Sequence, residues 1–411
     1  MESFIGKCLD SVLAQSLKEI EIICIDDGST DHTEQLIYQL QKEHANIIYK
    51  KQMNLGAGPA RNLGIACARG RYITFMDADD FYPDASALEY LYETAERLEI
   101  KICGGSRCVC HEDVIALHGA KKDLVFSEDQ IISAEQFSAW NGYQQFIYNK
   151  DFITKNKLRF PNYRRCQDPP FFAKALSLVK EIFVCKIFSY CYRKEHKEVI
   201  FDQTKALDYL KGIRDTLKIT VQSRMWKMYT NVLNDFFGEA SAIMYKYIAE
   251  GNQEMLFLSR EIRELILPEK ILKEDYVHEK RALLEEDKIA GYVMRVREKW
   301  DQFFEQLKGK KILIFGAGTM ARKLYQVLKE KNVYIEAFIV SDTEQNVSQI
   351  EGVKVRQMDD YCDVSDQYFV IFAAFGFWVN EMHMVLRQKG FSKYKQVNLE
   401  ELYLYANRIV H

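Results

Sequence analysis

The stretch IICIDDGSTD, residues 22–31, decides the fold of the first part of the chain. The apolar segment from Ile20 to Ile25 is typical of a strand that is buried on both faces of a parallel sheet. Gly28 permits a sharp turn, and Asp31 with Glu34 three residues later has the pattern of a helix capping box. The stretch therefore predicts a strand, a turn and a helix, in that order.

Helix and strand patterns alternate on both sides of this stretch. Apolar spacing predicts a helix over residues 3–16, and a second helix runs to about Gln41. Short strands are predicted at 47–49 and 72–76, and between them a helix opens at 56–59. Such alternation predicts a doubly wound α/β layer.

The pattern changes twice further along the chain. We expect residues 1–200 to form the α/β domain, residues 201–306 a helical connector, and residues 307–411 a small Rossmann-like α/β domain. A chain of 411 residues is long enough for two or three domains. Pro268 is the only proline in the predicted connector, which otherwise keeps helical periodicity.

Composition narrows the classes of function. The net charge is −3 with both signs interspersed, so the sequence shows no basic footprint for nucleic acid. The longest apolar run, residues 368–379, is shorter than the ~18–20 residues of a membrane span and fits a buried strand with its turn. Ten cysteines and no export signal favour reduced thiols in a cytoplasm.

One cysteine cluster, at Cys103, Cys108, Cys110 and His111, raises the alternative of a zinc site. Its spacing matches no known zinc pattern. The alternation at 108–110 fits a strand, so we expect buried thiols.

Two acidic sites follow predicted strands. Asp26 and Asp27 end the first strand, where ligands bind in open α/β sheets, although a plain strand-to-helix turn is the favoured interpretation of this pair taken alone. Asp77 and Asp79 form a D-x-D pattern, followed by Asp80. Paired carboxylates suit Mg²⁺ or Mn²⁺, and without a cation the three charges would repel one another. A solvated acidic turn is the alternative.

A third acidic residue, Asp168, precedes Pro169 and is expected to be a helix N-cap. Capping does not exclude chemistry, since it holds a carboxylate rigidly. Between the first two acidic sites, residues 54–64 combine glycines with Arg61, a pattern that can approach phosphates.

Three stretches in this order resemble the inverting family-2 glycosyltransferases of the GT-A fold. They are IICIDDGSTD (22–31), NLGAGPARNLGIACARGRYITFMDADD (54–80) and NKDFITKNKLRFPNYRRCQDPPFF (149–172). About fifty residues separate the first acidic site from the second, and about ninety more lead to the third. The resemblance covers roughly the first half of the chain.

The resemblance implies a nucleotide-sugar donor, most often a UDP-sugar. Asp27, together with Asp26, is expected to contact the base or ribose, and Arg61 to hold the nucleotide. Asp77 is expected to take part both in nucleotide-sugar binding and in metal binding. Implied acceptors are a glycan or a lipid-linked saccharide in a bacterial polysaccharide pathway. Peripheral association with the inner face of the membrane and oligomerisation stay open.

The resemblance also implies the chemistry. Asp77 and Asp79 are expected to position Mn²⁺ or Mg²⁺ on the diphosphate, with Asp79 as the more direct ligand, and Asp168 is expected to be the general base. Arg193 and His196 follow a strand and either reach the diphosphate or, as their charged surroundings favour, form a solvated charge run.

The sequence departs from the family at its start. Members usually begin with an apolar strand that ends in a Pro-x-Tyr-Asn-like turn, and this chain shows only the helix that follows. That strand normally lies centrally in the sheet. A relative that keeps the fold and acts as an assembly subunit without catalysis is therefore the main alternative.

The C-terminal part has its own motif. KILIFGAGTMA, residues 311–321, reads as a strand, a G-x-G-x-x-A turn and a helix start. Gly316, Gly318 and Asp342 are candidates for a second nucleotide site, with Asp342 meeting a ribose, although a docking or oligomerisation domain is favoured. An NAD(P)-dependent oxidoreductase centred here ranks lowest, because it leaves the acidic motifs unexplained.

Overall fold

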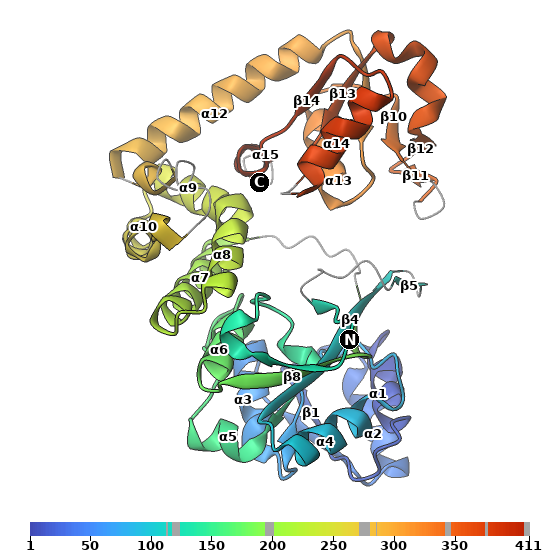
Figure 1. Ribbon diagram of the computed structural model, residues 1–411, viewed down its shortest axis with the longest axis vertical. Coiled ribbons are helices and arrows are strands. Elements are labelled where there is room, and N and C mark those ends of the chain that lie inside the picture. Colours follow the sequence, from blue (N-terminus) through green and yellow to red (C-terminus); the bar gives the residue numbers. More distant parts are fainter. Residues whose placement is uncertain are drawn as a thin grey trace. The chain divides into compact units, whose positions relative to one another are not determined.

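The computed structural model describes residues 1–111, 114–116, 124–193, 201–270, 280–284, 286–341, 347–374 and 377–406 (Figure 1). The chain divides into two compact units. The first comprises Met1–Asn234 and Glu261–Glu274, and the second Asp235–Arg260 and Asp275–His411. The three-domain division made from the sequence stays a prediction.

The elements of the first unit follow the alternation expected from the sequence. Their bounds are α1 (Ile5–Leu13), β1 (Ile22–Asp26), α2 (Thr33–Glu43), β2 (Ile47–Lys51), α3 (Ala57–Cys67), β3 (Tyr72–Ile73), α4 (Ala87–Leu98), β4 (Ile102–His111), β5 (Val114–Ala116), β6 (Gln130–Ser133), β7 (Phe146–Asn149), α5 (Lys150–Lys155), α6 (Asp168–Ser177), β8 (Glu181–Arg193), α7 (Gln203–Gln222) and α8 (Trp226–Asp235).

The strands of this unit form two sheets. β1 and β2 pair in parallel, and among the described strands they pair with no other. The larger sheet has the order β3-β7-β4-β8-β6, with β5 added to β4. Only its β4–β8 pair is parallel, and these two long strands run side by side in Figure 1. The layer is therefore mixed rather than wholly parallel.

Apolar helix faces hold this unit together. In α4, Leu88, Leu91 and Ala95 lie on one face and pack against the sheet at Cys103 and Ile147. Removing apolar area from water contributes roughly 25 cal/mol per Å², so these contacts are the main stabilising term. The apolar residues whose spacing predicted this helix are thus the residues that the structure buries.

Two local predictions need correction. Helix α2 begins at Thr33 with His32 as its N-cap, and the Asp31 carboxylate accepts the Thr33 N–H at 3.1 Å. Glu34 pairs with Lys51 instead of completing a capping box, because the neighbouring strand offers a cation. Strand β3 spans only Tyr72–Ile73 and not residues 72–76.

The cysteines predicted as buried thiols lie in β4. Cys103, Cys108 and Cys110 are buried, and Cys108 and Cys110 pack with Cys191 of β8 and with Phe81. Strand formation therefore explains their alternation.

The second unit combines helices with a sheet of its own. Its elements are a π-helical turn (Phe236–Ala240), α9 (Ser241–Ala249), the first part of α10 (Gln253–Leu265), α12 (Glu286–Leu307), β9 (Lys311–Phe315), α13 (Thr319–Glu330), β10 (Ala337–Val340), β11 (Gln349–Ile350), β12 (Val353–Gln357), β13 (Tyr368–Phe372), α14 (Phe377–Gln388), β14 (Tyr394–Gln396) and α15 (Leu399–Ala406).

The sheet of the second unit has the order β11-β12-β10-β9-β13-β14 and is parallel except for the β11–β12 pair. Figure 1 shows the helices α13 and α14 beside this sheet and α12 as one long helix. Leu313, Val370 and Phe372 of the strands pack with Leu386 of α14. The order reverses direction at β9, as in a Rossmann-like sheet.

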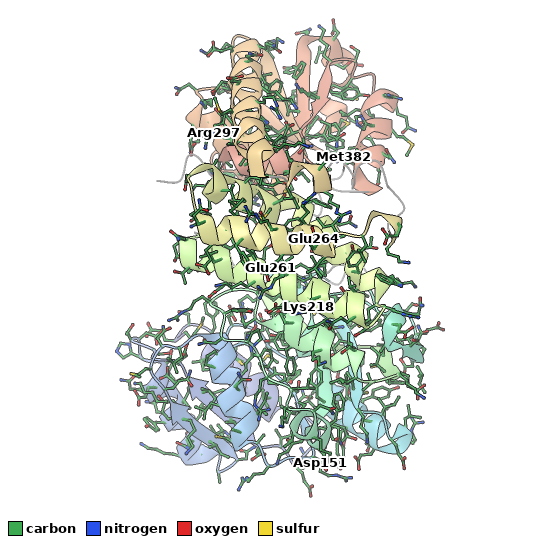
Figure 2. The ribbon with its side chains drawn as sticks, turned by 90° about the vertical axis from the view of Figure 1, so that its left-hand side faces the viewer. Asp151, Lys218, Glu261, Glu264, Arg297 and Met382 are labelled. Atoms are coloured by element: carbon green, nitrogen blue, oxygen red, sulfur yellow. The ribbon has the colours of Figure 1, made fainter. Side chains whose placement is uncertain are left out.

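Charged side chains lie over the helices in Figure 2, which labels Lys218 on α7 and Glu261 on α10. Glu261 accepts a hydrogen bond from Arg214 Nη1 of α7 at 2.8 Å, so that within the first unit α7 is tied to the end of α10.

Among the described residues, no helix is both long and apolar enough to cross a membrane.

Gly212 of α7 allows a close approach to the segment before α6. A Cβ at Gly212 would lie 2.2 Å from the carbonyl oxygen of Cys166, a backbone atom that cannot turn aside. At Gly6 of α1 an added Cβ meets nothing within 4 Å. We expect Gly212→Ala to lower the free energy of unfolding by about 1–3 kcal/mol through overpacking.

Gly6→Ala is the matched control in the same unit and should raise that free energy by about 0.5–1 kcal/mol, since alanine is the better helix former. Urea denaturation followed by circular dichroism measures both. Equal effects of the two substitutions would contradict the packing of α7 on Cys166.

Candidate functional site

An ion pair joins α3 to the turn after β3. Arg61 Nη2 lies 2.6 Å from Asp77 Oδ1, and Gln144 Nε2 donates to the second oxygen, Asp77 Oδ2, at 3.1 Å. Burial alone would raise the pKa of Asp77, but the charge and hydrogen bond of Arg61 outweigh it and hold that pKa below its ordinary value. The carboxylate of Asp77 is therefore ionised and engaged on both oxygens.

Aromatic rings pack against Arg61. Its guanidinium lies 5.2 Å from the ring centroid of Tyr143 and 5.4 Å from that of Phe160. Phe160 stacks on Phe171 of α6 at 4.0 Å, and Phe75 contacts both rings edge-on. These rings come from four separate segments, so the cluster fixes the site in position.

The segment before α6 is held against α3 by two further contacts. Asn62 exchanges two hydrogen bonds with the backbone of Phe160, at 2.8 and 2.9 Å. Gly58 is needed at the start of α3, because a Cβ there would lie 2.5 Å from the carbonyl oxygen of Pro161. The glycine-rich stretch thus serves close backbone packing.

Asp168 lies at the start of α6, with Gln167 as N-cap, so the predicted N-cap position is wrong by one residue. Burial raises the pKa of Asp168, with the charge of Arg61 opposing and that of Asp77 adding to the rise. These mutual interactions place the three groups in one electrostatic neighbourhood. A carboxylate with a raised pKa is a stronger base than an ordinary one.

Asp27 organises the loop before α3. Its carboxylate accepts the backbone N–H groups of Leu55 and Gly56, both at 2.8 Å, and Gln52 Nε2 at 2.7 Å. Gly56 has φ +99°, which a side chain would strain. The Asp27 carboxylate, at the end of β1, thus shapes the loop that leads into α3.

Asp26 is the buried member of the first acidic pair. It accepts the Ser29 N–H at 2.7 Å and the Tyr49 hydroxyl at 2.7 Å. Burial would raise its pKa, but these hydrogen bonds and the charge of Lys51 lower it overall. Asp26 therefore stabilises the turn after β1.

Asp80 anchors the D-x-D turn to β8. Its carboxylate accepts the Tyr190 hydroxyl and, at 2.7 Å, the Arg193 N–H, while only 1% of the residue is exposed. Burial is the largest cause of a pKa raised to about 7. Tyr190 also accepts the Asp77 N–H at 3.3 Å, so one tyrosine holds both ends of the turn.

Arg193 is buried, which corrects its interpretation as part of a solvated charge run. Its Nε donates to the carbonyl oxygen of Asp79 at 2.9 Å, and its guanidinium lies over the rings of Phe4 and Phe81. Arg193 thus supports the D-x-D turn from the end of β8. His196 lies outside the described residues.

The acidic residues differ in what they offer a divalent cation. Among the described residues there is no group of three or more His, Cys, Asp or Glu side chains that could hold a metal ion. Asp77 is engaged on both oxygens and Asp80 is buried, whereas Asp79 is partly exposed at the same turn. This fits Mg²⁺ or Mn²⁺ held by one carboxylate and completed by substrate phosphates.

Sequence reasoning missed several residues of this site. Gln144 and Tyr143 come from a 3₁₀ turn just before the third motif, and Tyr190 comes from the last part of β8. The motifs carried no signal for them. Asn62 lies inside the second motif, and it is the one missed residue that the motifs could have indicated.

The glycine motif of the second unit forms a turn between β9 and α13. Gly316 has φ +103°, and its N–H donates to the Ile339 carbonyl at 2.8 Å. Gly318 is the N-cap of α13, and an added Cβ there would meet nothing within 4 Å. Asp342 lies outside the described residues, and the second nucleotide site stays a prediction.

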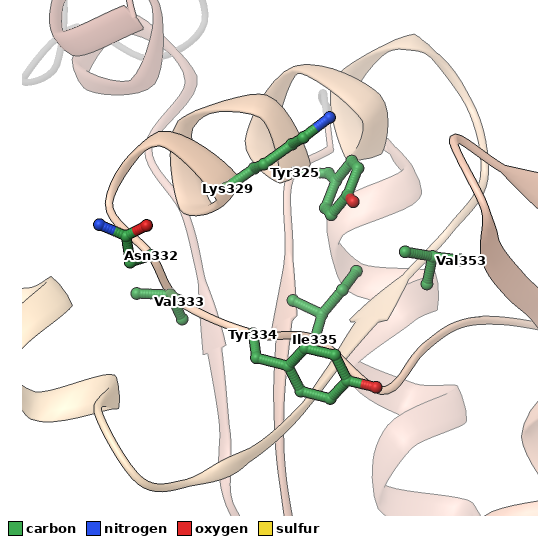
Figure 3. A pocket seen from close by; sticks show the side chains of 7 residues that line it. All are labelled: Tyr325, Lys329, Asn332, Val333, Tyr334, Ile335 and Val353. Carbon is green, nitrogen blue, oxygen red and sulfur yellow. The ribbon is translucent and has the colours of Figure 1, made fainter.

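A hollow of about 270 Å³ in the second unit lies away from that turn (Figure 3). Its lining residues are Tyr325, Lys329, Asn332, Val333, Tyr334, Ile335 and Val353. Most of them precede β10, whereas Gly316 follows β9, and these two strands are parallel. The hollow therefore lies near the starts of the parallel strands, whereas the glycine motif lies at their ends.

Two family models match separate parts of the chain. The sequence model of the family described as "Glycosyl transferase family 2" matches residues 2–162. A second model, described as "C2185-like, N-terminal", matches residues 308–394.

Individual relatives are similar over part of the chain. The chain is 41% identical over 104 residues to EpsJ, an uncharacterized glycosyltransferase of Bacillus subtilis, covering 25% of this chain and 30% of EpsJ. It is 25% identical over 255 residues to the glycosyltransferase GlyG of Streptococcus pneumoniae, covering 57% of this chain and 83% of GlyG. The chain thus spans less than a third of the first of these relatives.

A solved structure shows the same fold. Staphylococcus aureus TarS, residues 1–349, in complex with UDP-GlcNAc has a TM-score of 0.61 at 17% identity, covering 74% of this chain and 89% of that one. This likeness shows the fold, which is GT-A. Residues 2–162, with both acidic motifs after strands and Arg61 between them, thus match the model of glycosyl transferase family 2.

Proposed function

We propose that the chain is an inverting glycosyltransferase that moves a sugar from a UDP-sugar to a hydroxyl of a glycan or lipid-linked saccharide. The observation that carries the proposal is the convergence of distant motifs on Arg61. That guanidinium pairs with Asp77 and also acts on the pKa of Asp168, more than a hundred residues further along. A merely structural acidic turn would not need a second, partly buried carboxylate there.

The donor class follows from the family and from the shape of the loop. TarS, a protein of the same fold, was crystallised with UDP-GlcNAc, so UDP-GlcNAc is the first donor to test. In this proposal Asp27 receives the base or ribose at the loop it shapes, with Asp26 buried behind it, and Arg61 together with Asp77 borders the phosphates.

Asp168 is the proposed general base. It takes the proton of the acceptor hydroxyl as that oxygen attacks the anomeric carbon, and the bond from this carbon to the diphosphate oxygen breaks. Attack from the face opposite the leaving group inverts the anomeric configuration. The raised pKa of Asp168 suits proton abstraction, and Arg61 keeps the carboxylate ionised.

Asp79 is the proposed ligand of a divalent cation, with Asp77 supporting the turn through its ion pair. A bound Mg²⁺ or Mn²⁺ neutralises the charge that develops on the leaving diphosphate. Arg193 and Asp80 hold the turn that presents Asp79, because they bond to its carbonyl oxygen and to the backbone of β8.

The second candidate is a relative that keeps the fold without catalysing transfer. It is favoured by the separation of the β1–β2 pair from the larger sheet among the described strands. This candidate predicts that the protein binds no nucleotide-sugar. The two candidates are therefore separated by a binding experiment before any assay of turnover.

Asp168→Asn should strongly slow sugar transfer while leaving the donor bound. General-base catalysis contributes about 10²–10⁴-fold, so turnover should fall by that factor. The assay follows UDP release from a panel of UDP-sugars with Mn²⁺, and calorimetry measures UDP affinity. Asp151→Asn, at an exposed aspartate of α5 labelled in Figure 2, is the control and should leave both unchanged. Full activity of Asp168→Asn would refute the assigned base.

The rate should depend on pH through Asp168. Only the ionised carboxylate accepts a proton, so the rate should fall as pH drops through its pKa. Because burial raises that pKa, the acid limb should be centred above the ordinary aspartate value of about 3.9. UDP affinity over the same pH range separates binding from chemistry. An acid limb centred at or below that value would contradict the raised pKa.

A further inference from the structure

Arg107 lies at an irregular point of the sheet beside the candidate site. The register of β4 against β8 shifts between Gly104 and Ser106 and again between Ser106 and Arg107. Such bulges turn side chains in new directions and are common beside active sites. After the shifts, Arg107 is paired with Tyr190, whose hydroxyl bonds to Asp80.

The guanidinium of Arg107 has no directly bonded anion within the described part of the chain. No hydrogen bond or ion pair joins its guanidinium to a described residue, and its Nε is buried without a hydrogen-bond partner. Its charged end instead lies 5.3 Å from the ring centroid of Tyr192. Arg107 is partly buried, and desolvating a cation that has no hydrogen-bonded anion costs folding free energy, so an anionic ligand would stabilise it.

The neighbours of Arg107 include both the D-x-D turn, through Asp80, and the proposed base Asp168. Burial lowers the pKa of Arg107, while Tyr190, Tyr192, Asp80 and Asp168 oppose that change, so these groups are its electrostatic neighbours. Asp168 is the group that would contact the acceptor hydroxyl. The glycines and backbone N–H groups around residue 56, in contrast, belong to the loop that Asp27 shapes for the nucleotide.

Two neutral groups near Asp77 are also without partners. The Tyr143 hydroxyl and Gln144 Oε1 are buried and form no hydrogen bond among the described residues. Tyr143 interacts electrostatically with both Asp77 and Asp168. A polar ligand with hydroxyl groups, such as a sugar, would satisfy them.

We propose that Arg107 selects an acceptor that carries an anionic group, a carboxylate or a phosphate, next to the hydroxyl that is glycosylated. A guanidinium binds either anion through paired, charge-assisted hydrogen bonds. This inference rests on the proposed function, because it takes Asp168 as the mark of the acceptor side. It assigns Arg107 to specificity and not to the chemical step.

Calorimetry with UDP and Mg²⁺ present tests the inference without turnover. The probes are methyl glucoside, methyl glucoside 6-phosphate and methyl glucuronide, which share a ring and differ in charge. The natural protein should bind one anionic probe about tenfold or more tightly than the neutral one, and which one it is distinguishes phosphate from carboxylate. Arg107→Gln should remove this preference, and Arg107→Lys should keep part of it.

Arg97→Gln, at an exposed arginine of α4, is the control with the same change of charge and should keep the whole preference. Thermal unfolding checks that each variant is folded. If Arg107→Gln does not fold, the partial loss of preference in Arg107→Lys is the test. Equal binding of all probes by the natural protein would overturn the inference. So would a preference that survives in Arg107→Gln, or a loss of UDP affinity by the same factor, which would assign Arg107 to the donor. Absence of UDP binding by the natural protein is a separate result and contradicts the proposed function.

Discussion

The ion pair between Arg61 and Asp77 is the interaction on which the rest of the candidate site depends. It fastens α3 to the turn after β3, and the rings of Tyr143 and Phe160 cover it. A charge in such surroundings must be paired, since removing one partner leaves the other uncompensated at a cost of about 3–5 kcal/mol. The same guanidinium acts on Asp168, so the position of Arg61 sets both the phosphate side and the proposed base.

The carboxylates of the site divide the work between structure and chemistry. Asp26 and Asp27 bond to backbone groups that shape two loops, and Asp80 holds the D-x-D turn to β8. With Asp77 paired to Arg61, Asp79 and Asp168 are the residues that we assign to cation and proton. Burial and neighbours, rather than residue type, thus separate roles among chemically identical side chains.

Much of this arrangement could be predicted from the sequence. Asp26 and Asp77 follow apolar segments, and such segments end at the ligand-binding edge of an α/β sheet. The antiparallel course of β7, the burial of Arg193 and the contacts of Gln144 and Tyr190 could not, because each depends on segments far apart in the chain. The capping box at Asp31 failed for a related reason, since Lys51 of β2 competes for Glu34.

Manganese binding in the presence of UDP shows directly which carboxylate of the D-x-D turn holds the cation. Electron paramagnetic resonance measures the free Mn²⁺ that remains when the ion is titrated with the natural protein, with Asp77→Asn or with Asp79→Asn. We expect Asp79→Asn to weaken Mn²⁺ binding by about tenfold or more, because it removes the proposed ligand. Asp77→Asn breaks the ion pair that supports the turn, so it should lower the unfolding temperature and weaken Mn²⁺ binding clearly less than Asp79→Asn does. Equal weakening by both substitutions, or weakening by Asp77→Asn alone, would contradict the assignment of Asp79 as the ligand.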